Sequence, residues 1–285
     1  MESVLTKMLM QKNIGTPQQL DMAIKEVLQE LILASLSTTD FFSKAAFYGG
    51  TSLRIFYGLR RFSEDLDFSL LEKDPSFKWA PYFKQIEQTF ERFGLKVETI
   101  EREKVSATDT RSAFIKENTI ETMKILLPDD FAFPPLNHNQ VTKIKFEVDT
   151  VPPRGATYQW LHLSQPFFAN IRVLDLPSLF AGKISAVLLR QWKSRIKGRD
   201  FYDYLYYIGR NAKINLNYVS QNLAKAGITD PLSLERLKQM LADRFQTVDF
   251  KEAANEAATF LENPKEVEIW DKEFFLATLE RLSAV

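Results

Sequence analysis

A glycine pair, a threonine and two aspartates within residues 49–67 constrain this chain more than any other feature. Gly49, Gly50 and Thr51 follow a short apolar run, and Asp65 and Asp67 come fourteen and sixteen residues after Thr51. Residues i and i+2 of a strand point to the same face, so we expect the two aspartates to lie side by side. Neighbouring carboxylates repel each other unless a cation lies between them. The segment therefore predicts a cation site beside a tight turn.

The turn and the aspartate pair together indicate phosphate chemistry. Glycine lets the backbone come close to a phosphate, and exposed N–H groups in such a turn can hold it. A hard cation such as Mg²⁺ takes oxygen ligands and usually arrives with the phosphates of a nucleotide. Taken separately, an Asp-x-Asp is usually a solvated strand end and a Gly-Gly is usually a plain turn. In this order and spacing they favour phosphoryl or nucleotidyl transfer.

The segment resembles the signature of the nucleotidyltransferase superfamily, in which Asp-x-Asp on a strand follows a small-residue turn by about ten to fourteen residues. One branch, the AbiEii/AbiGii toxin family that includes the MenT toxins, is similar over a longer string: Gly49-Gly50-Thr51-x-Leu53-Arg54, then Arg61-x-Ser63-x-Asp65-Leu66-Asp67-Phe68. The family comprises effectors of bacterial toxin–antitoxin and phage-defence systems. The resemblance implies that the nucleotide is bound by Gly49, Gly50, Thr51, Arg54 and Ser63.

Two later segments resemble further motifs of the family. Lys183 lies among apolar residues, where a lysine is rare without a partner, unless its charge reaches the surface. The resemblance assigns Lys183 to the site, where it would bind the triphosphate as a point charge. Arg199-Asp200-Phe201-Tyr202-Asp203 is similar to an Arg-Asp-x-x-Asp motif whose first aspartate, here Asp200, is needed for activity. An aspartate in the first turn of a helix is also simply stabilising.

A third carboxylate on a later strand completes a two-metal site in the superfamily. Residues 143–149 alternate between apolar and charged side chains, so Glu147 and Asp149 share one face of the predicted strand. The resemblance favours Glu147, because it stands in a Lys-x-Glu setting like that of the family. The alternative is a strand surface that simply faces solvent.

Composition narrows the class of protein. Lys and Arg together number 37, as do Asp and Glu, so the chain is not basic overall, as a general nucleic-acid coat would be. There is no cysteine, and His138 and His162 are too isolated for a histidine metal cluster. No apolar run approaches the length of a membrane span, and the N-terminus lacks a signal-peptide core, so we expect a soluble cytoplasmic protein.

One stretch of the chain is locally basic. Residues 183–199 contain six Lys or Arg and no acidic residue. Such a cluster can receive an RNA backbone, although a solvated helix end is an equal alternative. The candidate RNA contacts are Arg190, Lys193, Arg195 and Lys197.

Periodicity predicts an α+β fold. Thr16-Pro17 begins a helix that runs to about Ser37. We expect strands at Ala45–Tyr48, Asp65–Leu71, Lys96–Lys104, 120–127 and 143–149, and early helices at Ser52–Leu59 and Pro81–Phe93. After about residue 170 no segment is clearly a strand. The later helices are expected at Pro177–Trp192, Asp200–Gly209, Leu216–Ala226, Leu232–Phe245, Phe250–Leu261 and Trp270–Leu282.

These expectations combine into one hypothesis. Residues 1–172 form a nucleotidyltransferase-fold domain with a mixed sheet and an N-terminal helix, and residues 173–285 form a helical domain that contributes Lys183 and Asp200 to the cleft. Asp65, Asp67 and Glu147 hold Mg²⁺ or Mn²⁺, and Asp65, Asp67, Lys183 and Asp200 are the catalytic residues.

The resemblance implies a toxin that transfers NMP from an NTP to the 3′ end of tRNA, blocks translation and is restrained by an antitoxin. The alternatives are a small-molecule or protein acceptor, or an inactive nucleotidyltransferase fold used as a binding module.

Overall fold

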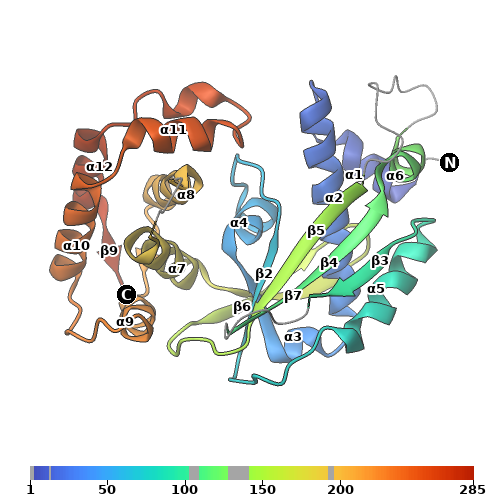
Figure 1. Ribbon diagram of the computed structural model, residues 1–285, viewed down its shortest axis with the longest axis horizontal. Coiled ribbons are helices and arrows are strands. Elements are labelled where there is room, and N and C mark those ends of the chain that lie inside the picture. Colours follow the sequence, from blue (N-terminus) through green and yellow to red (C-terminus); the bar gives the residue numbers. More distant parts are fainter. Residues whose placement is uncertain (1–2, 13, 103–108, 128–140, 192–195) are drawn as a thin grey trace. The chain divides into compact units, whose positions relative to one another are not determined.

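The computed structural model describes residues 3–12, 14–102, 109–127, 141–191 and 196–285, arranged in two compact units (Figure 1). The first unit comprises Met1–Ser52, Glu64–Pro152 and Trp160–Val173, and the second comprises Leu53–Ser63, Pro153–Gln159 and Leu174–Val285. Lys193, Arg195 and His138, together with the predicted helix end at Trp192 and the predicted strand end at Lys104, lie outside the described residues.

The elements up to residue 174 build the sheet and its helices. In chain order they are α1 (Val4–Met10), α2 (Pro17–Ser37), α3 (Phe41–Lys44), β1 (Ala45–Tyr48), α4 (Gly49–Tyr57), β2 (Leu66–Leu70), α5 (Ala80–Arg92), β3 (Glu98–Glu101), β4 (Thr110–Asn118), α6 (Thr119–Leu126), β5 (Val141–Asp149), β6 (Tyr158–Leu163) and β7 (Ala169–Leu174). Helix α4 begins in the first unit and ends in the second.

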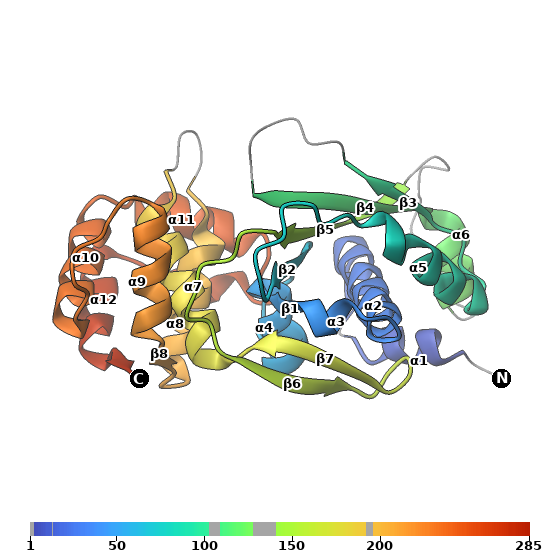
Figure 2. The ribbon, with the colours of Figure 1, turned by 90° about the horizontal axis from the view of Figure 1, so that it is seen from below.

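The seven strands form one mixed sheet in the order β3-β4-β5-β2-β1-β7-β6. Strand β2 pairs antiparallel with β1 and parallel with β5, whereas β4 pairs antiparallel with both β3 and β5. The sheet curves around α2 (Figure 2). Helix α2 is buried on nearly every side, which explains its long run of Leu, Ile, Val and Ala.

Aromatic side chains fill the space between α3, α5 and the inner face of the sheet. Phe41 lies 4.9 Å from Phe68 and 5.4 Å from Trp79, between ring centroids, and Trp79 lies 4.7 Å from Phe146. The Trp79 indole also donates a hydrogen bond to the backbone carbonyl of Arg111. This core sets the register of β2 and β5, because Phe68 and Phe146 must both point inward.

The outer face of the same strands is polar. On β5, Ile144, Phe146 and Val148 are buried, so Lys145 and Glu147 project from the opposite face. The register places Asp67 of β2 directly beside Glu147. The sheet therefore presents Asp67 and Glu147 together on its outer face.

The second unit consists mainly of helices. They are α7 (Leu176–Leu189), α8 (Gly198–Gly209), α9 (Leu216–Lys225), α10 (Leu234–Gln246), α11 (Phe250–Ala258) and α12 (Lys272–Thr278), with 3₁₀ turns η1 (Pro264–Val267) and η2 (Leu279–Arg281) and a two-stranded pair of β8 (Lys213–Ile214) and β9 (Ser283–Ala284). Phe201 of α8 lies in an aromatic core with Phe245, Phe250 and Phe275.

The predicted α+β class, with a mixed sheet followed by helices, is confirmed. The strand predicted at residues 120–127 is wrong, because this segment forms helix α6. Asn118 accepts a hydrogen bond from the Glu121 N–H and so starts the helix, and the buried Thr122, Met123 and Leu126 follow helical spacing.

Other parts of the prediction also differ from the structure. Helix α4 begins at Gly49 instead of Ser52, and Asp65 stands just before β2. The expectation of no strand after about residue 170 is wrong, since β7 continues to Leu174 and β8 pairs with β9. A two-residue strand is too short to show an alternating pattern.

Candidate active site

Gly49 and Asp67 approach each other closely. Gly49 is the first residue of α4 and has a φ of +83°, a conformation that residues with a Cβ adopt only under strain. A Cβ on Gly49 would lie 2.6 Å from Oδ2 of Asp67, too close for any side chain. Tyr48, the residue before Gly49, pairs directly with Asp67 across β1 and β2. The glycine turn and the aspartate pair are therefore parts of one local structure.

Thr51 connects the same turn to the other aspartate. Its hydroxyl donates a hydrogen bond of 2.5 Å to the backbone carbonyl of Asp65, and its side chain is buried. Thr51 thus fixes the chain at the entry to β2, where Asp65 stands. Gly49, Gly50 and Thr51 also form the first turn of α4, and the N-terminal end of a helix attracts anions.

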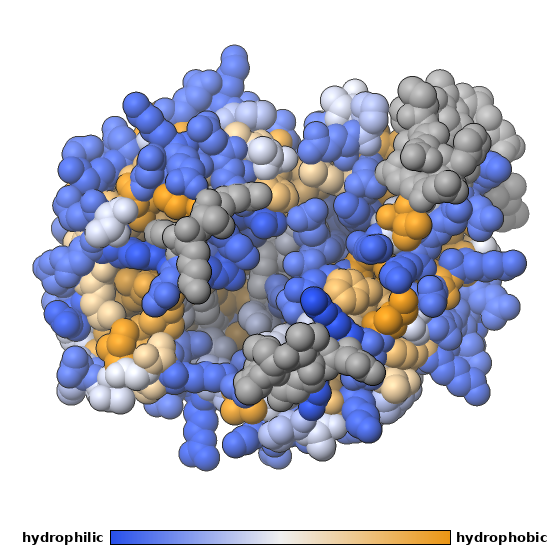
Figure 3. All heavy atoms as spheres, in the orientation of Figure 1, coloured by the Kyte–Doolittle hydropathy of each residue, from blue (hydrophilic) through white to orange (hydrophobic). Residues whose placement is uncertain are grey.

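Glu147 already has partners for both of its carboxylate oxygens. Oε1 accepts a hydrogen bond of 2.6 Å from the Ser112 hydroxyl, and Oε2 lies 2.6 Å from the Lys145 ammonium. Asp149, the alternative third carboxylate, accepts a hydrogen bond of 2.9 Å from the Val151 N–H. In Figure 3 this β3–β4–β5 part of the sheet faces the viewer, and hydrophilic and hydrophobic residues mix over it. The choice between Glu147 and Asp149 stays a prediction.

The donor set suits a hard cation. Within the ranges that the structure describes, no three His, Asp or Glu side chains already stand in the geometry of a metal site. Asp65 and Asp67 nevertheless offer carboxylate oxygens next to a helix start, which is the chemistry that Mg²⁺ or Mn²⁺ prefers. The aspartate pair therefore fits the cation, and Glu147 would have to exchange Lys145 or Ser112 to join it.

Arg54 and Ser63 lie in the second unit. One guanidinium nitrogen of Arg54 donates to the backbone carbonyls of Leu59 and Arg61, at 3.1 and 3.2 Å. The guanidinium also lies 4.5 Å from the centre of the Phe62 ring and pairs with Glu262 at 3.5 Å. Arg54 therefore braces the loop that follows α4. Ser63 lies in this loop and is half-buried.

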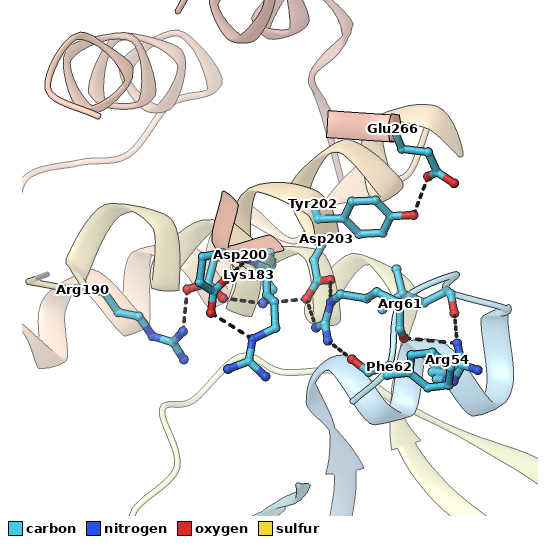
Figure 4. Close-up of polar contacts among 12 residues, drawn as sticks. Arg54, Arg61, Phe62, Lys183, Arg190, Asp200, Tyr202, Asp203 and Glu266 are labelled. Carbon is cyan, nitrogen blue, oxygen red and sulfur yellow. Dashed lines mark hydrogen bonds and ion pairs between the residues drawn. The ribbon is translucent and has the colours of Figure 1, made fainter. Parts of the chain in front are cut away.

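A buried cluster of charges surrounds Lys183 in the second unit (Figure 4). The Lys183 ammonium lies 2.7 Å from Asp200 Oδ1 and 2.8 Å from Asp203 Oδ2. Asp203 also accepts two hydrogen bonds from Arg61, and Asp200 accepts one from Arg190. Only Arg190 has a substantially exposed side chain, at 44%. Lys183 and Asp200 therefore contact each other within this unit. Their contribution to the cleft beside Asp65 and Asp67 stays a prediction.

The cations determine the ionisation of both aspartates. Burial alone would raise the pKa of Asp200, but Lys183 and Arg190 outweigh it and lower that pKa to about 2. Burial likewise opposes ionisation of Asp203, and Arg61 and Lys183 hold its pKa below the usual value. Both carboxylates are therefore charged at neutral pH. Removing one member of such a buried pair typically costs about 3–5 kcal/mol.

Asp203 and Arg61 have more contacts in the structure than their places in the sequence indicate. Asp203 is completely buried and binds two cations, whereas the resemblance singles out Asp200. Which of the two aspartates matters more for activity stays a prediction. Arg60 and Arg61 both lie between Leu59 and Phe62, but only Arg61 is buried, so the local pattern does not single it out. Its partner is 142 residues away in sequence, which no local pattern reveals.

In the described part of the predicted RNA-binding stretch, cations lie close enough to act on one another, with Asp200 and Glu256 opposing them. Lys197 stands just before α8, and the nearby charge of Arg190, followed by partial burial, lowers its pKa. Arg199 adds to this repulsion, although it pairs with Glu256. Like charges at this place favour a bound anion.

A family model described as "Nucleotidyl transferase AbiEii toxin, Type IV TA system" matches residues 31–278. The chain belongs to this family. It is therefore a nucleotidyltransferase toxin of the type IV toxin–antitoxin class, with NTP as substrate and an antitoxin as partner. No protein of curated function matches the chain.

Solved structures of two other proteins share the fold of this chain. JHP933 from Helicobacter pylori is 17% identical, with a TM-score of 0.51 over 93% of this chain and 90% of that one. MenT4, a nucleotidyltransferase toxin from Mycobacterium tuberculosis H37Rv, is 16% identical, with a TM-score of 0.50 over 97% of this chain and 87% of that one. At these identities the similarity shows the fold alone. Among the described residues, no helix combines the length and apolar character needed to traverse a bilayer.

Proposed function

We propose that this toxin transfers NMP from an NTP to the 3′ end of tRNA and thereby blocks translation. The observation that carries the proposal is the close approach of Gly49 to Asp67, together with the hydrogen bond from Thr51 to Asp65. A helix start suited to phosphates is in this way built onto a carboxylate pair suited to a divalent cation. Nucleotidyl transfer requires both.

The first turn of α4 holds the triphosphate, with Gly49, Gly50 and Thr51 supplying backbone N–H groups. Asp65 and Asp67 hold Mg²⁺ or Mn²⁺, with Glu147 as the third carboxylate. When bound, the cation supplies charge stabilisation for the α-phosphate and the leaving pyrophosphate. The acceptor hydroxyl attacks the α-phosphorus in line, its oxygen forms the new P–O bond and loses its proton to solvent, and the bond to the pyrophosphate breaks.

The remaining motif residues act on charge and position. The order of the motifs supports Lys183 as the cation that neutralises the triphosphate and Asp200 as the carboxylate that holds Lys183. The 2.7 Å contact between these two side chains agrees with this division of roles. Arg54 and Ser63 act on the nucleotide through the loop between α4 and β2.

The acceptor is assigned to tRNA on the family resemblance and on the basic stretch. Arg190 and Lys197, with Lys193 and Arg195, contact the RNA backbone. The lowered pKa of Lys197 supports this role, because a phosphate would relieve its repulsion by Arg190. The corresponding biology is growth arrest in the cytoplasm, restrained by the antitoxin and triggered in phage defence.

The test is to incubate the purified protein with each labelled NTP and total tRNA, and to sequence RNA 3′ ends. We expect added nucleotides at the 3′ ends of tRNA, from one preferred NTP. Transfer of label to a small molecule or a protein would replace the acceptor and keep the reaction. If no NTP were hydrolysed or transferred with any of the metals tested, the proposed function would be contradicted and a binding module favoured.

A further inference from the structure

We propose that Arg61 is a positioning residue that acts on Lys183 through Asp203. The inference rests on the proposed function, in which the Lys183 ammonium neutralises the triphosphate. A lysine carries its charge on a flexible four-carbon stem, so its position depends on its partners. The contacts of Arg61 show how that position is fixed.

The side chain of Arg61 is committed to the protein interior. Nε donates to Asp203 Oδ1 at 2.6 Å and Nη2 donates to Asp203 Oδ2 at 2.7 Å. Nη1 donates to the backbone carbonyl of Phe62 at 2.9 Å. All three nitrogens thus have acceptors, and the side chain is only 5% exposed. Arg61 is therefore placed to orient Asp203 and not to touch a substrate (Figure 4).

The backbone of Arg61 is equally constrained. Arg61 forms an antiparallel bridge with Leu261, and the next N–H, of Phe62, donates to the carbonyl of Phe260 at 2.9 Å. The guanidinium therefore projects from a fixed point of the second unit. The bidentate contact between Arg61 and Asp203 then fixes both the position and the plane of the Asp203 carboxylate.

Asp203 transmits this constraint to Lys183. Its Oδ2 atom accepts from Arg61 and also lies 2.8 Å from the Lys183 ammonium. Asp203 is completely buried, so no solvent competes for that oxygen. Asp200, one turn earlier on α8, holds the ammonium from a second direction at 2.7 Å. Two carboxylates, one of them locked by Arg61, thus fix the lysine charge.

Arg61 also changes the charge balance of the cluster. Arg61, Lys183 and Arg190 carry three positive charges against the two negative charges of Asp200 and Asp203. The buried Glu256, which pairs with Arg199, is a further carboxylate that acts on Arg61. Arg61 therefore offsets negative charge beside the two aspartates that hold Lys183.

A double-mutant cycle tests the proposal. Transfer kinetics are measured for Arg61→Lys, Lys183→Ala and the double variant, each at a temperature where thermal melting shows it folded. Arg61→Lys keeps the positive charge but cannot make the bidentate contact with Asp203. We expect its kcat/KM for NTP to fall about tenfold or more, chiefly because KM rises. The double variant should match Lys183→Ala within about twofold, because both changes remove one function.

A matched control removes a different buried contact of α8. Tyr204→Phe deletes the hydrogen bond between Tyr204 and Thr278 and leaves the charge cluster intact. We expect it to lower Tm while kcat/KM stays at the wild-type value. If Tyr204→Phe lowered kcat/KM as much as Arg61→Lys, the effect would be general destabilisation and the positioning role would be wrong.

The outcomes separate this inference from the proposed function. The positioning role would be overturned if Arg61→Lys kept the wild-type kcat/KM, or if the losses in the double variant were additive. An impaired Lys183→Ala would in that case still support the function of Lys183. Wild-type kinetics in Lys183→Ala would overturn both.

If Arg61→Lys does not fold, Asp203→Asn replaces it in the cycle, because it weakens the contacts that join Arg61 to Lys183. In either variant, acylation of Lys183 by an amine reagent, followed by mass spectrometry, should be faster than in the wild type. An unchanged rate would contradict the proposal without reference to activity.

Discussion

At the scale of single residues, Gly49 connects the two halves of the signature. Its positive φ and the 2.6 Å space between its would-be Cβ and Asp67 exclude every side chain. The glycine is therefore needed for two separable reasons, backbone conformation and room for a carboxylate. Another glycine of the same unit has only the first requirement, since Gly94 has a φ of +79° and open space around its would-be Cβ.

We predict that Gly49→Ala strongly impairs transfer and that Gly94→Ala does not. Both variants should lose about 1 kcal/mol of stability to the strained backbone, because alanine disfavours positive φ. Only Gly49→Ala should also displace the Asp67 carboxylate, with at least a tenfold loss of kcat/KM. Thermal melting and initial rates measure the two effects. Equal activity in the two alanine variants would mean that the contact with Asp67 does not matter for the reaction.

At the scale of elements, capped and amphipathic segments were predictable from sequence. Thr16 caps α2 as its sequence indicated, by accepting from the Gln19 N–H, and β5 shows the alternation expected of residues 143–149. Segment 120–127 does not show its helical start in its own pattern, because the residue that starts the helix, Asn118, lies before it. The bend of β4 into α6 depends on packing that a local pattern does not contain.

The junction of β4 and α6 also contains a buried acid. Burial raises the pKa of Glu117 to about 7, partly offset by a hydrogen bond of 2.8 Å from the Thr122 hydroxyl. Among the described residues, the other carboxylate oxygen of Glu117 has no hydrogen-bond partner. The folded protein therefore holds the proton of Glu117 more tightly than the unfolded chain does.

We predict that the free energy of unfolding falls as pH rises from about 4.5 to about 7. In this window the unfolded chain releases the Glu117 proton and the folded protein keeps it, so the native state binds more protons and the slope is negative. The full effect is on the order of 3 kcal/mol and is reached above the folded pKa. Glu117→Gln should remove it and raise Tm at about pH 8 by several degrees.

Thermal melting across this pH range measures the effect of Glu117→Gln. Glu98→Gln on β3 is the control, because Glu98 is exposed and its change should leave the pH dependence intact. Parallel Tm profiles for the wild type and Glu117→Gln would show that Glu117 ionises normally in the folded protein.

At the scale of the whole molecule, the order of motifs indicated the family, but the contacts within each unit needed the fold. Asp65, Asp67, Lys183 and Asp200 carry recognisable spacing. The hydrogen bonds from Arg61 to Asp203 join residues 142 positions apart, and the hydrogen bond from Ser112 to Glu147 joins residues 35 positions apart. Such pairs arise from strand register and helix packing, which periodicity alone does not define.

We predict that the basic stretch serves RNA and not the nucleotide. Reversing Arg195 and Lys197 to Glu should weaken tRNA binding and flatten its salt dependence, because fewer counterions are released. Mg-NTP affinity should barely change. The measurements are tRNA affinity across a salt series and NTP affinity at one salt concentration. Lys272→Glu on α12 is the control, as an exposed lysine outside the stretch.

An unchanged tRNA affinity and salt slope in the Arg195 and Lys197 reversal would remove this stretch from the RNA interface. That result would shift the acceptor towards a small molecule or a protein.

The most direct test of the central claim is transfer from NTP labelled at either the α- or the γ-phosphate. Nucleotidyl transfer at the Asp65–Asp67 pair predicts that tRNA gains the α label, that the γ label leaves with pyrophosphate, and that Asp67→Ala, although folded, loses at least about a hundredfold in rate. Retention of the γ label on the product, or near-normal transfer by Asp67→Ala, would contradict the claim.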